Sequence, residues 1–400
     1  MGQPLFLLEN PVQNYAWGSL TAIADLLGRP SPNGLPEAEL WIGAHPKAPS
    51  RILEPAGAGT LDQAIHRAPV ALLGPEVCDR FGNELPFLLK VLAAAEPLSI
   101  QAHPNPEQAR RGWTRENEEG IPLDAPRRNY RDPNHKPELL CALGPFTGLK
   151  GFRPVEEIAR HFDPLKLPEI AAELSRLGRD RSPAALRAFF ARLMTLDADE
   201  RAPLLSRALA EARRRGGRDP AWGWVSRLHE KYPGDVGVLS PLYLNLVTLE
   251  PEEAVFLPAG ELHTYLEGTA LEIQANSDNV LRGGLTPKHV DVPELLATLA
   301  FEPRPREVLR PHEAEPGEQI YRTPAREFEL ALLRVTPRRP FVSAPGRGVE
   351  VLLSLEGTPV IHTDAGPLPL ERGRAVFVPA SAPSYRLEGE GRLCRGRVGA

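Results

Sequence analysis

The chain has 400 residues, of which 42% are hydrophobic and 25% are charged, a composition typical of a soluble protein with roughly two or three domains. Its net charge of -5 argues against nucleic-acid binding, and no apolar run approaches the ~20 residues needed to span a bilayer. The cysteines Cys78, Cys141 and Cys394 lack CxxC spacing, which fits a reducing cytoplasm and excludes a thiolate zinc site. We expect a cytoplasmic monomer that acts on a small molecule, without nucleic-acid or membrane partners.

The first 60 residues mix short apolar runs with turn residues. Residues 14–19 (NYAWGS) and 39–50 (ELWIGAHPKAPS) are typical of strand and loop. Trp17 and Trp41 are candidates for lining a substrate pocket, although tryptophan is more often a core residue in a chain of this size.

Residues 85–103 predict a buried strand followed by an alternating one. The first strand carries a single charge, Lys90. In the second, apolar residues alternate with Ser99, Gln101 and His103, which therefore share one face of the strand. This strand is therefore expected to present a row of polar side chains that ends in a histidine.

A loop at 129–137 leads into the next predicted strand. His135, Lys136 and Glu138 cluster where that strand begins. Pro137 favours an extended backbone for this segment, because it restricts the residue before it as well as itself.

The remaining sequence alternates between helical and strand character. Apolar residues at three- and four-residue spacing predict a helical insertion of about four or five short helices over 153–233. Strand character returns at 234–302, a Pro/Glu/Arg-rich linker follows at 303–318, and 319–400 is again β. We therefore expect a mainly β chain in which 1–152 and 234–302 form a discontinuous catalytic module and 319–400 form a second module.

The stretch 254–288 carries several chemically active residue types. A PAGxxH turn ends at His263, an alternating strand carries Glu272, and a loop carries Arg282 and Lys288. Side chains suited to metal binding, acid–base chemistry and anion binding therefore lie within one short stretch.

An internal repeat links this stretch to the C-terminal region. Residues 254–268 and 375–389 align without gaps, and eight of the fifteen positions are identical. The repeat favours two related β-barrel modules. Ser384 stands where the first copy has His263, so the second module is expected to keep the fold and lack the metal ligand.

Most histidines are expected to be inert because they stand alone in loops or on helical surfaces: His45, His66, His161, His229, His312 and His362. Four other side chains would supply two imidazoles, a carboxylate and an amide oxygen: Gln101, His103, Glu138 and His263. This set suits a divalent metal with open coordination positions. No HExxH motif supports a metalloprotease.

Four motifs occur in the order LSIQAHP, NHKPELL, PAGELHTY and EIQANSDNVLRGGLTPK, and together they resemble those of the type I mannose-6-phosphate isomerases. The two N-terminal segments, the helical insertion and the C-terminal β region match as well, so the resemblance covers nearly the whole chain. It implies two cupin-type jelly-roll β-barrel modules and one zinc ion per chain. The zinc ligands that it implies are Gln101, His103, Glu138 and His263, and the implied catalytic arginine is Arg282.

The resemblance implies interconversion of mannose 6-phosphate and fructose 6-phosphate. This reaction moves a proton between C1 and C2 through a cis-enediol, and it requires a base and a group that stabilises the oxyanion. The base is left open between Glu272 and the pair His135 and Lys136. The candidates for substrate binding are Lys288, Lys90, Ser99 and Trp17.

Two other functions are kept as alternatives. One is a non-catalytic cupin that binds a sugar phosphate, and the intact ligand set of the first module argues against it. The other is a metal-dependent cupin oxygenase, which requires iron and open positions for dioxygen. The loop carrying Arg282 and Lys288 would serve no purpose in an oxygenase.

Overall fold

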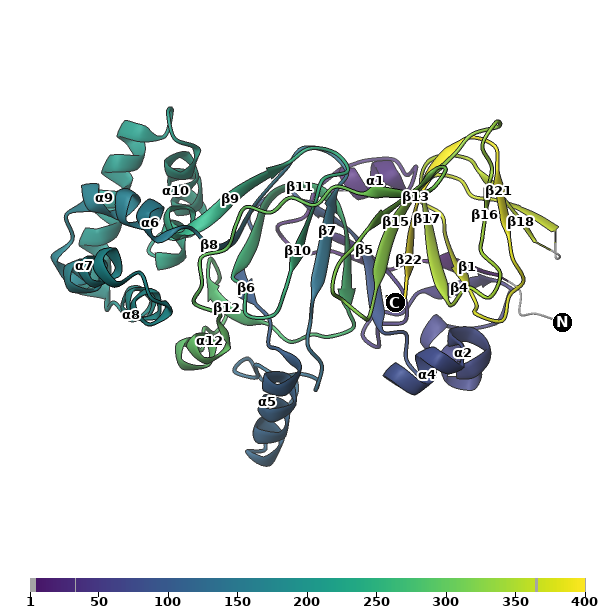
Figure 1. Cartoon of the computed structure of the whole chain (residues 1–400), viewed down its shortest axis with the longest axis horizontal. Helices are drawn as coiled ribbons and strands as arrows, with labels where there is room; N and C mark the ends of the chain where they lie inside the picture. Colours follow the sequence, from purple (N-terminus) through teal and green to yellow (C-terminus); the bar gives the residue numbers. More distant parts are fainter. Residues whose placement is uncertain (1–4, 33, 364–365, 400) are drawn as a thin grey trace.

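The computed structural model describes residues 5–32, 34–363 and 366–399. Figure 1 shows an elongated molecule with a group of helices at one end and two sets of strands along the rest of its length. The strands form sheets of ten, eight and four strands. The prediction of a mainly β fold with a helical insertion is confirmed. Within the described ranges, the strand pairings are those of open sheets and close no barrel.

The ten-stranded sheet belongs to the first module and is organised around its longest strand, β11. Its strands are β2 (Val12–Gln13), β3 (Glu39–Ile42), β5 (Phe87–Ala94), β6 (Ile100–Ala102), β7 (Glu138–Ala142), β8 (Phe146–Phe152), β9 (Leu244–Leu249), β10 (Ala254–Leu257), β11 (His263–Ala275) and β12 (Leu281–Gly284).

Strand β11 changes partners half-way along its length. Its first half pairs with β6 and β8, and its second half pairs with β5 and β7. The change occurs at Gly268, whose φ of +125° is rarely adopted by other residues. A Cβ there would lie 2.8 Å from the carbonyl oxygen of Pro145, so only glycine fits. One strand therefore carries His263 on one wall of the module and Glu272 on the other.

The helical insertion forms the group of helices at the end of the molecule that Figure 1 shows in teal. It comprises α6 (Val155–Phe162), α7 (Ala171–Asp180), α8 (Pro183–Met194), α9 (Ala198–Arg215) and α10 (Pro220–Lys231), with 3-10 turns at Asp163–Leu165 and Pro168–Ile170. A 3-10 turn at Val236–Leu239 and the short α11 (Ser240–Tyr243) follow, beyond the predicted bound at 233. The core of the insertion contains large buried aromatic residues: Phe162, Phe189, Phe190 and Trp222. Asp197 and Glu200 form a capping box at the start of α9, which satisfies free backbone N–H groups there.

The eight-stranded sheet contains strands from both ends of the chain. In spatial order it runs β13 (His312–Glu315), β14 (Glu318–Tyr321), β15 (Glu329–Val335), β22 (Gly391–Arg397), β17 (Glu350–Gly357), β20 (Ala375–Val378), β1 (Phe6–Glu9) and β4 (Arg51–Glu54). Strand β1, which lies within the predicted first module, thus pairs with β20 of the second, and β4 joins the same sheet through β1. Strand β13 lies in the predicted linker at 303–318. The proposed domain boundaries themselves stay a prediction.

The four-stranded sheet faces the eight-stranded one in the second module. Its strands are β16 (Phe341–Val342), β21 (Arg386–Glu388), β18 (Val360–Thr363) and β19 (Gly366–Pro369). Buried residues of both sheets form one hydrophobic cluster, as expected for a two-sheet jelly roll: examples are Leu333, Val376, Ile361 and Leu387.

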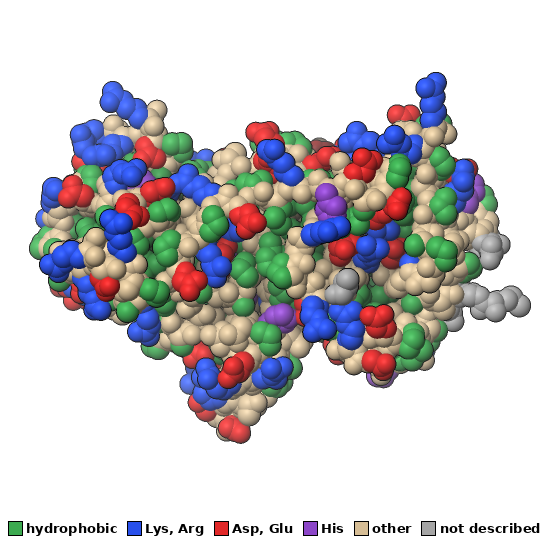
Figure 2. Space-filling model, viewed as in Figure 1, with side chains coloured by type: hydrophobic (Ala, Val, Ile, Leu, Met, Phe, Trp, Pro, Cys, Tyr) green, Lys and Arg blue, Asp and Glu red, His purple; other side chains and the backbone are tan. Residues whose placement is uncertain are grey.

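The remaining helices are α1 (Ala22–Leu26), α2 (Leu61–Arg67), α3 (Pro69–Leu73), α4 (Pro75–Phe81), α5 (Pro106–Glu118) and α12 (Val292–Thr298). None of the helices in the described part of the chain combines the length and the apolar character needed to cross a membrane. On the face drawn in Figure 2, basic and acidic side chains are interspersed rather than gathered into a stripe of one sign.

Candidate functional site

Side chains of β5, β7 and β11 alternate between two faces. One face packs in a hydrophobic core shared with the second module, and the other lines the polar interior of the first module. Odd-numbered residues of these strands, among them Leu89, Leu139 and Ile273, pack in one hydrophobic cluster with residues of the eight-stranded sheet. Because successive side chains point to opposite faces of a strand, the even-numbered residues face the interior of the first module. These include Lys90, Glu138, Glu272 and Gln274, all of which are buried.

The opposite wall of this interior contributes a second row of side chains. Gln101 on β6 lies opposite His263 on β11, and Arg282 on β12 lies opposite Gln101. Directly opposed residues on antiparallel strands share a face of the sheet. Together with Glu138 and Lys136, Gln101 and His263 line a polar cavity of about 50 Å³.

The PAGxxH turn brings the two histidine-bearing segments together. Gly260 has a φ of +74° and donates its backbone N–H to the carbonyl oxygen of His103, at 2.8 Å. A Cβ at this glycine would lie 3.0 Å from the carbonyl oxygen of Thr298. His103, Glu138 and His263 converge as a result, with their ligand atoms within 4.8 Å of one another. These three residues are called the metal-binding group below.

The hydrogen bonds of the two histidines show which ring nitrogen carries the proton. Nδ1 lies 2.7 Å from the carbonyl oxygen of Asn279 in His103 and 3.0 Å from that of Glu261 in His263. A carbonyl oxygen only accepts, so Nδ1 carries the hydrogen and Nε2 carries the lone pair. Both Nε2 atoms therefore direct lone pairs at the carboxylate of Glu138, 3.3 Å away in each case.

A nitrogen lone pair that faces a carboxylate oxygen is repelled by it unless a cation lies between the two atoms. Burial lowers the pKa of His103 to about 4, so a proton on the ring does not supply that positive charge at neutral pH. Its buried Nε2 has no hydrogen-bond partner among the described residues. The donor set of two imidazoles and one carboxylate thus fits a divalent metal such as zinc.

Lys136 and Gln101 complete the surroundings of this group. Lys136 Nζ lies 3.1 Å from Glu138 Oε1. Burial alone would raise the pKa of Glu138, but Lys136 and His103 outweigh it and hold that pKa well below its usual range. Gln101 Nε2 donates to Ser99 Oγ at 3.3 Å, which leaves its amide oxygen available as the fourth ligand predicted from the sequence.

Lys90 and Glu272 form a buried polar network beside the metal-binding group. Lys90 Nζ donates to Glu272 Oε2 at 3.0 Å and to Gln274 Oε1 at 2.8 Å, and Glu39 lies 3.6 Å away. Tyr265 donates its hydroxyl hydrogen to Glu272 Oε1 at 2.9 Å. Burial raises the pKa of Glu272, Lys90 lowers it, and the nearby carboxylates add to the rise. Lys90 is engaged internally rather than held free for a phosphate.

Trp17 and His135 are predicted site residues that do not line this cavity. Trp17 is half-buried against an apolar cluster and contacts Tyr15 in a tilted arrangement, with ring centroids 5.7 Å apart. His135 Nε2 lies 2.7 Å from Glu327 Oε1, which belongs to the segment before β15 in the second module. Trp41 is nearer the site than Trp17, since Lys90 Nζ lies 5.4 Å from its ring centroid.

Three cations, Arg131, Arg282 and Lys288, lie near one another around β12, and Arg131 was not expected from the sequence. Burial and the charge of Arg131 lower the pKa of Arg282, and burial with both arginines lowers the pKa of Lys288. Within the described ranges, none of these side chains has an ion pair or a hydrogen bond. Neighbouring cations without a carboxylate partner favour an anionic ligand. The sequence showed Arg131 only as one more charge in a polar loop.

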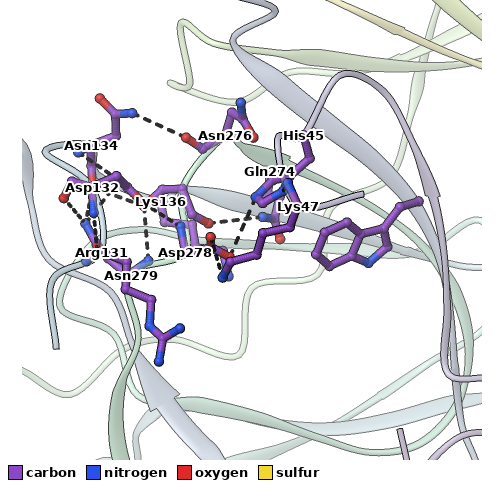
Figure 3. Close-up of polar contacts among 12 residues, drawn as sticks. His45, Lys47, Arg131, Asp132, Asn134, Lys136, Gln274, Asn276, Asp278 and Asn279 are labelled. Atoms are coloured by element: carbon purple, nitrogen blue, oxygen red, sulfur yellow. Dashed lines mark hydrogen bonds and ion pairs between the residues drawn. The ribbon is translucent and has the colours of Figure 1, made fainter. Parts of the chain in front are cut away.

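His45, which was expected to be inert, also borders the site. Its ring contacts that of Trp41 at a centroid distance of 4.8 Å. Figure 3 shows His45 and Lys47 beside Asp278, whose carboxylate lies 3.6 Å from His45 Nε2 and 2.7 Å from Lys47 Nζ. Residues 45 and 278 are brought together only by the fold, so the sequence held no local signal for this pair.

Strand register identifies the counterpart of Glu138 in the second module. Glu138 lies opposite Leu257, and Glu350 lies opposite Val378. The internal repeat aligns Leu257 with Val378, so Glu350 occupies the position of Glu138.

The surroundings of Glu350 differ from those of Glu138. Tyr385 donates to it at 2.8 Å, Arg395 Nη1 lies 3.4 Å away and Arg347 Nε lies 3.7 Å away. Two arginine side chains thus balance the charge of Glu350. In the first module, Glu138 instead faces two imidazole lone pairs. Ser384 stands at the repeat position of His263.

Comparison with known proteins gives consistent matches over the whole chain. The family model described as phosphomannose isomerase type I, catalytic domain, matches residues 5–155. The mannose-6-phosphate isomerase of Escherichia coli (strain K12) is 41% identical over 392 residues, which cover 97% of this chain and 98% of the relative. That of Homo sapiens is 37% identical over 418 residues and covers 94% of each chain.

Solved structures agree with these sequence matches. A zinc-bound mannose 6-phosphate isomerase superimposes with a TM-score of 0.91 at 40% identity, covering 99% of this chain and 100% of the other. The apo form from Salmonella typhimurium has a TM-score of 0.91 at 40% identity and covers 99% of both chains.

Proposed function

The chain belongs to the type I phosphomannose isomerase family, and on that premise we propose that it interconverts mannose 6-phosphate and fructose 6-phosphate with one zinc ion per chain. The observation that carries the proposal is the pair of Nε2 lone pairs that face the carboxylate of Glu138. His103, Glu138 and His263 would hold the ion, with the amide oxygen of Gln101 as a fourth ligand. A zinc ion bound there supplies Lewis-acid polarisation of the sugar oxygens.

The cations Arg131, Arg282 and Lys288 are proposed to bind the phosphate. Arg282 lies on the strand next to Gln101, which in turn lies next to His263. Adjacent strands are about 5 Å apart, so the base of the Arg282 side chain lies about 10 Å from that of His263. This arrangement supports a substrate with its phosphate at the cations and its C1–C2 end at the metal-binding group.

Glu272 is proposed as the base that moves the proton. Its carboxylate takes the proton from C2 of the open-chain aldehyde form of mannose 6-phosphate, which leaves a cis-enediolate with its negative charge on O1, and the O2 hydroxyl proton then moves to O1. The same carboxyl group then returns a proton to C1, which gives fructose 6-phosphate. Burial raises the pKa of Glu272 and makes it a stronger base than an ordinary glutamate, while Lys90 and Tyr265 fix both oxygens. Lys136 is the other candidate, because it also lines the cavity.

The two alternatives are not favoured. A non-catalytic sugar-phosphate module would not need a buried carboxylate with a raised pKa beside the metal-binding group. An oxygenase would not need three cations that have no carboxylate partner among the described residues. A cytoplasmic location, a monomeric state and the lack of nucleic-acid and membrane partners stay proposals, supported by the three free cysteines and the net charge of -5.

Zinc removal tests the proposed function. Treatment of the purified protein with a chelator is expected to abolish formation of fructose 6-phosphate from mannose 6-phosphate, and added zinc is expected to restore it. The assay measures fructose 6-phosphate against zinc content per chain. Full activity in protein that has been shown to be free of metal would overturn the proposal.

Arg131→Ala is expected to raise KM for mannose 6-phosphate by about tenfold, the loss typical of a charged hydrogen bond worth ~1.5 kcal/mol, and to leave kcat nearly unchanged. The side chain would contact the phosphate, which does not change during the reaction, so ground state and transition state lose the same binding energy. Arg127→Ala is the matched control in the same loop. An unchanged KM in the Arg131 variant would remove this residue from the phosphate site.

A further inference from the structure

The side chain of His135 connects the catalytic module to the second one. Its Nε2 donates to Glu327 Oε1 at 2.7 Å, and the two side chains are only 28% and 14% exposed. We propose that Glu327 is a positioning residue for the reaction, which acts through His135 on Lys136 and Glu138. This inference rests on the proposed function and gives the second module a role in catalysis without a metal site of its own.

The extended backbone after His135 transmits the contact to the cavity. Pro137 keeps Lys136 extended, because the α region is disfavoured for a residue before proline. In an extended segment the side chains of Lys136 and Glu138 share one face, and His135 points to the other. Lys136 thus reaches Glu138 at 3.1 Å inside the cavity, while His135 reaches the second module.

The part of this loop before His135 is held by the first module. Asn279 accepts from the backbone N–H of Arg131 at 2.7 Å and donates to the carbonyl oxygens of Asp132 and Asn134, both at 2.8 Å. Figure 3 shows Asn279 among these residues, with Lys136 nearby. These hydrogen bonds end at Asn134. The contact of His135 with Glu327 follows directly and is the side-chain contact that immediately precedes Lys136.

The environment of Glu327 makes the contact specific. Its Oε2 is buried and has no hydrogen-bond partner among the described residues. Burial alone would raise the pKa of Glu327, but the hydrogen bond and charge of His135 hold it below the usual value. The Glu327 side chain is partly buried and one of its oxygens is fully buried, so the hydrogen bond to His135 favours one arrangement of the two side chains.

Steady-state kinetics of the zinc-loaded, full-length protein test the proposal. Glu327→Ala is expected to lower kcat about tenfold, as is typical when the support of a site residue is removed, with little change in KM and no loss of zinc. Glu327→Gln is expected to restore most of kcat, because its amide oxygen still accepts from His135. Glu388→Ala is the matched control, since it removes a carboxylate 3.2 Å from His362 in the same module and away from the site; its kcat is expected to be unchanged.

A double-mutant cycle separates positioning from general destabilisation. His135→Ala is expected to lower kcat by the same factor as Glu327→Ala, and the double variant is expected to be no slower than either. Additive losses, equal losses in the Gln and Ala variants, or an unchanged kcat in Glu327→Ala would each overturn the inference. An inactive wild-type protein would instead overturn the proposed function, so the two failures are distinguishable.

Discussion

Glu138→Gln is expected to lower both zinc affinity and turnover, by at least the ~10–100-fold that follows loss of a partner of a metal ligand. The substitution keeps the side-chain volume and removes the negative charge that lies 3.3 Å from both Nε2 atoms. It also leaves the ammonium group of Lys136 next to the metal-binding group without its counter-charge. Zinc per chain after dialysis against a competing chelator, together with kcat, measures the effect.

Glu350→Gln is the matched control, because this residue occupies the same strand position in the second module. It is expected to retain zinc and turnover in the folded protein. Its thermal unfolding midpoint is expected to fall, because Arg395 and Arg347 lose the charge that balances them. Equal loss of zinc in both variants would contradict the assignment of the metal to the first module alone.

Glu272→Gln is expected to reduce kcat by about 10²–10⁴-fold, the usual contribution of a general base, with full zinc content. An amide cannot take a proton from carbon, and its single oxygen can still accept the hydrogen bond from either Lys90 or Tyr265. The measurement is turnover at saturating mannose 6-phosphate, with zinc determined on the same sample.

Lys136→Met provides the comparison for this variant, because Lys136 is the other candidate base in the cavity. A nearly normal rate in Glu272→Gln together with a large loss in Lys136→Met would move the proton transfer to the lysine. If Glu272 is the base, its variant is the slower of the two.

Local patterns were sufficient to predict much of the metal-binding group. Alternation at 98–103 placed Gln101 and His103 on one face of a strand, and the PAGxxH turn pointed to His263. The glycine in that turn indicated a backbone position with a positive φ. Gly260 adopts such a φ, and its backbone N–H donates to the carbonyl oxygen of His103. Each of these inferences depended on the backbone of a single segment.

Features that depend on contacts between distant segments could not be predicted in this way. Strand β1 pairs with β20 across more than three hundred residues, and no local signal specifies that pairing. Arg131 joins Arg282 only because Asn279 holds its loop in place. His135 lies next to Lys136 in the sequence but points to the other module, a consequence of extended geometry that a list of neighbouring residues does not reveal.

The most direct test of the central claim is to incubate the zinc-loaded protein with mannose 6-phosphate in D₂O and to follow both sugars by NMR. Proton transfer through a cis-enediol allows the base to exchange its proton with solvent, so fructose 6-phosphate is expected to appear with deuterium at C1. The reverse reaction is expected to place deuterium at C2 of mannose 6-phosphate. Absence of fructose 6-phosphate from protein that holds one zinc ion per chain, or a complete lack of deuterium in both sugars after many turnovers at equilibrium, would contradict the account.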